Sequence, residues 1–263
     1  MFPIQNKVVL VLVDGMRPDG LLSCGHAFLR DLTKKSTYCL RSRTVMPSVT
    51  LPCHTSLFMS VDPERHGILT NDWHAQVRPI ESLTELVHRF EGRTAMMYNW
   101  EQLRDLAKPS SLDFSYFRRL TKDQETSLAC DRELTDVCIE NLRREQPDFT
   151  FLYLGATDES GHRSGWMSEP YLEAIANASA CIQRVYEALD ENTSLIVTAD
   201  HGGQERSHGY DTPECMTIPI LMCGPAFKEN NELEALSIKD IAPTIARVLG
   251  IPASADWEGK SVI

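Results

Sequence analysis

One stretch of the sequence decides the fold: LIVTADHGG, at residues 195–203. Its first five residues are apolar or β-branched, which predicts a strand buried within a sheet. Asp200 and His201 end that strand, and in open α/β sheets ligands bind beyond the carboxyl ends of strands. With His208 close behind, these side chains suit zinc or manganese. The alternative is a polar turn in which both histidines only hydrogen-bond to their loop.

Two further strands are predicted to end in the same way. The apolar run Val8–Val13 is followed directly by Asp14, and residues 148–154 lead through a short loop to Asp158. His162 follows four residues later, so both side chains can face one metal ion if this loop coils through one turn. A single strand that ends in an acid is most simply a structural turn, but three such strands in one chain favour a site.

Thr50 is the candidate nucleophile. Pro52 suits the first turn of a helix, which places Thr50 at or near the N-cap. In one interpretation Thr50 only caps this helix. In the other, its hydroxyl is held where free N–H groups and the helix dipole favour a phosphate. A threonine hydroxyl needs a base or a metal to become a nucleophile, and the sequence contains no evident Ser-His-Asp arrangement, so a metal ion would have to activate it.

The other predicted elements alternate between strands and helices. Strands are expected at 94–98, 114–117 and 219–223, and helices at 21–35, 81–90, 125–144, 171–189 and 237–249. This alternation predicts one α/β domain over residues 1–263, a three-layer sandwich with a mainly parallel central sheet. Residues 72–147 could form a small subdomain that faces the substrate.

Charge and cysteine usage narrow the function. The 26 basic and 37 acidic residues give a net charge of −11, which argues against binding to bulk nucleic acid or to an anionic membrane. A small anionic substrate remains compatible, because bound cations would reverse the local field. Eight scattered cysteines without a C-x-x-C pair indicate reduced core residues of a cytoplasmic protein. The apolar run at 8–13 is too short for a signal peptide or a membrane span.

The polar residues at strand and helix ends form one candidate constellation. They are Asp14, Thr50, Asp158, His162, Asp200, His201 and His208. Three converging carboxylates would repel one another unless metal ions lay between them. Seven ligands for two ions leave coordination positions open, as in catalytic sites. Two ions about 3.5–4 Å apart can bind both the attacking and the leaving oxygen of an in-line displacement at phosphorus.

The order Asp…Thr…Asp-x-x-x-His…Asp-His…His resembles the alkaline phosphatase superfamily. The threonine within PSVTLP at 47–52, followed by His-Gly-Ile at 66–68 and by Asn71, is similar to the type I phosphodiesterase/nucleotide pyrophosphatase branch. The similarity extends over residues 8–260, nearly the whole chain. The resemblance therefore implies an alkaline phosphatase-like fold.

The resemblance also implies a role for each residue. One ion would be held by Asp158, His162 and His208. The other would be held by Asp14, Thr50, Asp200 and His201. Thr50 would be the metal-activated nucleophile that forms a phosphothreonine intermediate. Asn71 would face a non-bridging phosphoryl oxygen, the role of an oxyanion-hole donor; the alternative for Asn71 is a turn residue.

The leading hypothesis is a two-metal hydrolase, with zinc or manganese, that cleaves phosphodiester or pyrophosphate bonds of a small phosphate-ester substrate. The nearest alternative uses the same site as a phosphomonoesterase or phosphonate hydrolase. An alternative of another class is a metal-binding partner protein without catalysis. A sulfatase is disfavoured, because residues 53–55 do not fit the Cys-x-Pro-x-Arg signature.

Overall fold

The computed structural model describes residues 4–120 and 123–263. Within these ranges the strands form one eight-stranded sheet with the order β4-β3-β5-β1-β6-β7-β2-β8. The strands are β1 Lys7–Val13, β2 Ser36–Arg43, β3 Thr94–Tyr98, β4 Phe114–Phe117, β5 Phe149–Leu154, β6 Thr193–Thr198, β7 Thr217–Cys223 and β8 Asn231–Glu232. The predicted strands at 94–98 and 114–117 coincide with β3 and β4.

The sheet is mainly parallel, as predicted. From β4 to β6 every neighbouring pair is parallel, whereas β7 is antiparallel to both β6 and β2. The register pairs Val13 of β1 with Leu154 of β5, and Leu12 of β1 with Thr198 of β6. The carboxyl ends of these three central strands therefore lie side by side.

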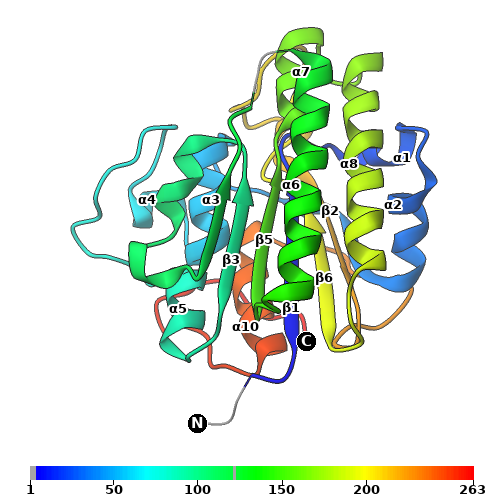
Figure 1. Ribbon diagram of the computed structural model, residues 1–263. Coiled ribbons are helices and arrows are strands. Elements are labelled where there is room, and N and C mark those ends of the chain that lie inside the picture. The colour runs from blue at the N-terminus through cyan, green and yellow to red at the C-terminus, as the bar shows by residue number, and fades with distance from the viewer. Residues whose placement is uncertain (1–3, 121–122) are drawn as a thin grey trace.

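Helices cover both faces of the sheet (Figure 1), which confirms the three-layer α/β architecture. One helical layer consists of α1 Pro18–Ser23, α2 Ala27–Leu32, α6 Gln124–Arg144, α7 Ala156–Ser164 and α8 Glu169–Glu187. The other consists of α3 Thr50–Met59, α5 Leu83–Arg89 and α10 Ile241–Leu249. Short turns complete the described chain: α4 Pro63–His66, α9 Pro213–Met216, η1 Thr33–Lys35, η2 Glu101–Leu106, η3 Pro109–Ser111 and η4 Ile238–Asp240.

One local expectation was wrong, and two features differ from the predicted elements. The single helix expected at 21–35 is divided into α1 and α2, because Gly25 adopts a left-handed conformation with φ of 80°. Strand β2 was not predicted, and its sequence STYCLRSR carries no clean alternation. The loop expected after β5 is the nine-residue helix α7, in which Asp158 and His162 are separated by about one helical turn.

The segment 72–147 contributes β3 and β4 to the central sheet and contains α6. That it faces the substrate stays a prediction. The eight cysteines all lie in the described ranges; they are free thiols, and seven of them are buried. No helix in residues 4–120 and 123–263 is long and apolar enough to cross a membrane. The expected cytoplasmic location stays a prediction.

Candidate active site

The carboxyl ends of β5, β1 and β6 bring the predicted acids to one edge of the sheet. Asp14 follows β1 directly, Asp200 follows β6 after one residue, and β5 leads into α7, which carries Asp158. Thr50 is the first residue of α3, one position after the N-cap Val49. The residue is 4% exposed. The hydroxyl of Thr50 does not cap the helix and instead faces the residues that follow β6.

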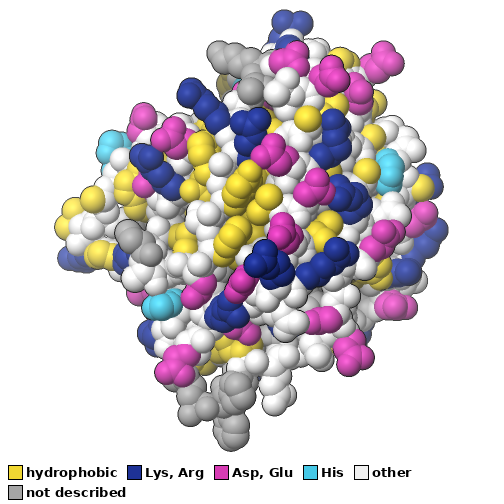
Figure 2. Space-filling model, in the orientation of Figure 1, with side chains coloured by type: hydrophobic (Ala, Val, Ile, Leu, Met, Phe, Trp, Pro, Cys, Tyr) yellow, Lys and Arg dark blue, Asp and Glu magenta, His cyan; other side chains and the backbone are white. Residues whose placement is uncertain are grey.

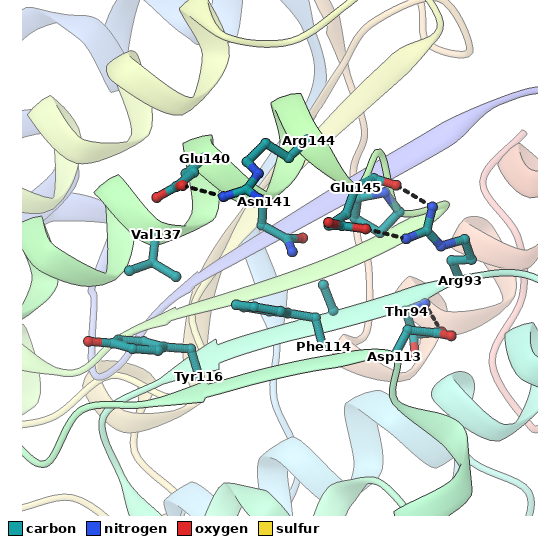
Figure 3. A pocket seen from close by; sticks show the side chains of 12 residues that line it. Arg93, Thr94, Asp113, Phe114, Tyr116, Val137, Glu140, Asn141, Arg144 and Glu145 are labelled. Carbon is teal, nitrogen blue, oxygen red and sulfur yellow. Dashed lines mark hydrogen bonds and ion pairs between the residues drawn. The ribbon is translucent and has the colours of Figure 1, made fainter.

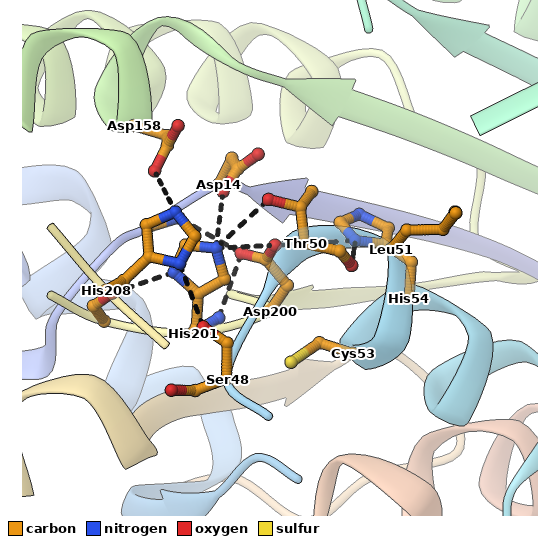
Figure 4. Close-up of polar contacts among 12 residues, drawn as sticks. Asp14, Ser48, Thr50, Leu51, Cys53, His54, Asp158, Asp200, His201 and His208 are labelled. Carbon is orange, nitrogen blue, oxygen red and sulfur yellow. Dashed lines mark hydrogen bonds and ion pairs between the residues drawn. The ribbon is translucent and has the colours of Figure 1, made fainter. Parts of the chain in front are cut away.

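Four of the predicted ligands meet at one nitrogen atom (Figure 4). His201 Nε2 lies 3.4 Å from Asp14 Oδ1 and 3.3 Å from Asp200 Oδ2. Thr50 Oγ1 is 3.3 Å from the same nitrogen. These are the residues that the resemblance assigns to one ion, so the structure brings this whole group together.

The other predicted group lies beside the first. Asp158 Oδ2 is 3.4 Å from His162 Nε2, one turn along α7, and Asp158 Oδ1 is 3.7 Å from His208 Nε2. Ligand atoms of Asp158, Asp14 and His201 also lie within 4.8 Å of one another, so Asp158 is close to both groups. The rings of His201 and His208 are stacked, with centroids 3.8 Å apart. The two groups therefore form one continuous cluster.

All three histidines present Nε2 to this cluster, because Nδ1 of each ring faces a backbone carbonyl. The Nδ1 atoms of His201, His208 and His162 lie 2.8, 2.9 and 3.0 Å from the backbone oxygens of Gly202, Ser48 and Arg206, respectively. A carbonyl oxygen only accepts, so each Nδ1 carries a proton and donates it. Burial, and then His208, lower the pKa of His201 well below its usual value, so this ring is neutral. Its Nε2 lone pair faces oxygens of Asp14 and Asp200, which only accept when the acids are ionised, and a cation between them would resolve that conflict.

The carboxylates are crowded and incompletely paired. Burial, and then the charges of Asp200 and Asp158, raise the pKa of Asp14 well above its usual value. Burial likewise raises the pKa of Asp200. Among the described residues, Asp14 Oδ1, Asp158 Oδ1 and Asp200 Oδ2 are buried and have no hydrogen-bond partner. Buried oxygens without donors, beside imidazole lone pairs, fit a divalent cation, which would favour the ionised carboxylates.

Several supporting residues were not predicted from the sequence. Asp200 Oδ1 accepts hydrogen bonds from the backbone N–H groups of Gly15, at 3.1 Å, and His201, at 2.9 Å. The hydroxyl of Tyr153, in β5, donates to Asp14 Oδ2. Tyr153 pairs in register with Leu12, close to the end of β1, and a correct β1–β5 pairing is the one sequence signal that could have identified it.

Asn71 lies in the loop after α4, and its side chain contacts the start of α3, where the predicted role requires it. Its Oδ1 accepts a hydrogen bond from the backbone N–H of Leu51 at 3.0 Å. Leu51 is the second residue of α3, where backbone N–H groups have no partner within the helix. The amide oxygen is therefore occupied, and the amide nitrogen, which only donates, is left for a group bound beside Thr50.

A pocket of about 550 Å³ lies away from this cluster (Figure 3). Its walls include Thr94 and Phe114, at the amino ends of β3 and β4, and Arg144, at the carboxyl end of α6. On the face drawn in Figure 2, hydrophobic side chains gather near the middle, with charged side chains of both signs around them. Sites in parallel α/β sheets form at the carboxyl ends of strands, so we assign the chemistry to the Asp/His cluster rather than to this pocket.

The fold is similar to that of two solved structures. Murine ectonucleotide pyrophosphatase/phosphodiesterase 5, an inactive form in complex with AMP, superposes with a TM-score of 0.78 and 18% identity over 97% of each chain. A phosphonate monoester hydrolase from Silicibacter pomeroyi superposes with a TM-score of 0.77 and 16% identity, over 98% of this chain and 76% of that one. The chain therefore shares the fold of these two structures.

Sequence comparison identifies the branch. Residues 8–217 match the type I phosphodiesterase/nucleotide pyrophosphatase family. The chain belongs to this family, which confirms the resemblance inferred from its motifs. The 2,3-bisphosphoglycerate-independent phosphoglycerate mutase of Onchocerca volvulus is 30% identical over 138 residues, which cover 49% of this chain and 26% of the mutase. The chain thus matches about a quarter of the length of such curated relatives.

Proposed function

We infer that this chain is a two-metal hydrolase that cleaves phosphodiester or pyrophosphate bonds through a phosphothreonine intermediate on Thr50. The family and the fold support the broader class of phosphoester hydrolases and phosphotransferases. One observation carries the finer proposal: Thr50 Oγ1 lies 3.3 Å from His201 Nε2. Thr50 is the first residue of α3 and lies beside the three acids.

The ligand atoms divide into two groups that would hold one ion each. Asp158, His162 and His208 form one, and Asp14, Thr50, Asp200 and His201 form the other. Imidazole and carboxylate ligands suit Zn²⁺, with Mn²⁺ as the alternative. Two bound divalent ions would supply positive charge that lowers the pKa of a hydroxyl and offsets the charge of a phosphoryl group.

The residues of the chain supply the nucleophile and the orientation. The Thr50 hydroxyl gives up its proton to solvent, and Oγ1 forms a bond to phosphorus as the bond from phosphorus to the leaving oxygen breaks; that oxygen leaves and takes up a proton from solvent. Water then attacks phosphorus and breaks its bond to Oγ1, which releases the phosphate product and restores the hydroxyl. The Asn71 amide nitrogen donates to a non-bridging phosphoryl oxygen, because Leu51 N–H already occupies the amide oxygen. The N–H of Gly15 and that of His201 hold Asp200 in place.

The charge around Thr50 supports a diester rather than a monoester substrate. No Arg or Lys occurs in residues 51–61, and Asn71 is neutral. Arg17 donates to Asp19 and to the Gly203 carbonyl, so its guanidinium is already engaged. Two divalent ions and one amide suit a singly charged diester better than a dianionic monoester.

The test compares three model substrates under identical loading with zinc or manganese. We expect kcat/KM for bis(p-nitrophenyl) phosphate to exceed that for p-nitrophenyl phosphate and for p-nitrophenyl phenylphosphonate. A ratio of diester to monoester well below one would favour the phosphomonoesterase alternative. No turnover of any ester by a metal-loaded, folded chain would favour the partner protein without catalysis.

A further inference from the structure

Trp166 joins the three segments that carry the acids and histidines. It lies just beyond α7, after Gly165, and its side chain is 7% exposed. The indole Nε1–H donates to the carbonyl oxygen of Gly15, the residue after Asp14, at 2.9 Å. The backbone N–H of Trp166 donates to the Glu205 carbonyl at 2.7 Å, in the loop that leads to His208.

The indole fits only because glycines flank it. A Cβ atom on Gly161, within α7, would lie 2.7 Å from the nearest indole atom. A Cβ atom on Gly203, in the loop after β6, would lie 2.2 Å from the nearest indole atom. Real Cβ contacts are not this short, so both segments approach the ring at the limit of packing. The ring therefore sets the spacing between α7 and the loop after β6.

The same ring contacts two of the histidines. Its centroid lies 5.2 Å from that of His162, with an interplanar angle of 87°, and 5.9 Å from that of His208, with an angle of 65°. Among the described residues, its further ring contact is with Tyr171 and not with His201. His162 is the most open of the three, with 42% of its side chain exposed. The indole thus packs against His162 and His208, two members of the more exposed ligand group.

We propose that Trp166 is the positioning residue that sets the distance between His162 and His208, and thereby the affinity of the ion that these residues and Asp158 would hold. The inference rests on the proposed two-metal function, since it concerns one of its two ion positions. Residues that orient metal ligands typically change metal affinity by about 10–100-fold when they are substituted.

The experiment titrates metal-free protein with Zn²⁺ in competition with a chromophoric chelator, which resolves two binding constants. In Trp166→Leu we expect one affinity to fall by about 10–100-fold, while the other stays within about twofold of the wild type. Trp166→Phe keeps an aromatic ring but loses the hydrogen bond to Gly15, so a smaller loss at the same ion is expected. The matched control is Trp257→Phe, because Trp257 Nε1 also donates to a backbone carbonyl, that of Glu81, at 2.8 Å.

Tryptophan fluorescence supplies a second readout. An ion bound at His162 and His208 changes the emission of the adjacent indole, so the emission change that accompanies binding of this ion should disappear in Trp166→Phe and persist in Trp257→Phe. If Trp166→Leu does not fold, Trp166→Phe decides the question. Unchanged affinities in Trp166→Phe and in any folded Trp166→Leu, or equal losses at both ions, would overturn the inference.

The failure of this inference can be told apart from that of the proposed function. A wild-type chain that binds two ions and hydrolyses bis(p-nitrophenyl) phosphate, but whose binding does not depend on Trp166, contradicts only the positioning role. A wild-type chain that binds no ion contradicts both proposals.

Discussion

The two ends of the central sheet differ in how they balance charge. At the amino end, the large pocket has charged walls in which opposite signs pair: Arg93 with Glu145 at 2.8 Å, and Arg144 with Glu140 at 3.0 Å. At the carboxyl end, three acids converge beside the neutral imidazole of His201, and three buried carboxylate oxygens find no donor among the described residues. Unbalanced buried charge, and not the size of a cavity, marks the end of the sheet that is built for chemistry.

The largest effect is expected at the hydroxyl of Thr50. Thr50→Ala should lower kcat/KM by about a hundred- to thousandfold or more, because it removes the proposed nucleophile. The six other ligands remain, so metal content should be unchanged. Kinetics on bis(p-nitrophenyl) phosphate, with metal analysis of the same samples, test this. Thr55→Ala is the control, since Thr55 is buried on the same helix and its hydroxyl donates to the Leu51 carbonyl at 2.7 Å, away from the Asp/His cluster. Full activity in folded Thr50→Ala would exclude the covalent mechanism.

Metal removal should lower stability and activity, because the proposed ligands lie at the carboxyl end of the sheet. Binding to the native state alone stabilises it by about 4 kcal/mol when free metal exceeds the dissociation constant a thousandfold. A strong chelator should therefore lower Tm and abolish activity together, and added zinc should restore both. Calorimetry and activity on the same chelated sample measure this. If thorough chelation alters neither, the Asp/His cluster is not a metal site.

A pH-dependent effect is expected from Asp131, a fully buried acid of α6. Asp131 Oδ1 accepts from Gly155 N–H at 3.2 Å and Oδ2 from Ala156 N–H at 3.3 Å, where α7 begins. Burial raises the pKa of Asp131 to about 7. The folded state therefore holds a proton that the unfolded chain releases near pH 4. The stability that this proton contributes is fully present below about pH 4 and is lost as the pH rises towards about 7.

Urea unfolding at several pH values, with chelator present, tests this sign. Between pH 4 and 7, Asp131 should add a slope of about −1.4 kcal/mol per pH unit to the unfolding free energy of the wild type. Asp131→Asn should lack that contribution, so the advantage of the wild type should shrink as the pH rises. The control is Asp136→Asn on the same helix, where the acid is exposed and pairs with Arg184. Parallel curves for the wild type and Asp131→Asn would contradict the raised pKa.

The smallest effect is expected at the amino end. Arg144→Gln breaks an exposed ion pair with Glu140, and such pairs contribute about 0–1 kcal/mol. We expect kcat/KM for bis(p-nitrophenyl) phosphate to stay within about twofold of the wild type, as for a surface substitution remote from the site. A large loss of activity in this variant would show that the pocket takes part in the reaction and that the contrast between the two ends does not hold.

The sequence predicts the fold class well because the central strands are nearly continuous apolar runs. Val8–Val13 is buried on both faces, and the runs in β5 and β6 end at turn residues, so their carboxyl ends could be located to within a residue or two. β2 escaped prediction because pairing with β7 and β8, rather than its own composition, makes it a strand. The polar helix α7 escaped for a similar reason, since α6 and α8 pack against it.

The candidate ligands could be predicted because Asp14 and Asp200 follow strands, Thr50 begins a helix, and the three histidines follow acids closely along the chain. Their assignment to ions stays a prediction. Tyr153 and Trp166 could not be predicted, because their roles depend on which segments lie side by side in space. Nothing local distinguishes Trp166 from a core residue; its position between Gly161 and Gly203 identifies it. Candidate metal ligands can thus be predicted from the sequence pattern, whereas the residues that orient them are identified only from tertiary packing.

The place of β1 in the sheet has a consequence for how the chain folds. This strand comes first in the described chain, yet both of its neighbours, β5 and β6, come from its second half. During synthesis, Val8–Val13 therefore stays an unpaired apolar segment until most of the chain has left the ribosome. Pairings between such distant strands form slowly and leave aggregation-prone strand edges exposed in the meantime. The acids at the strand ends thus meet only late in folding, and a chain cut short before β6 has no means of assembling them.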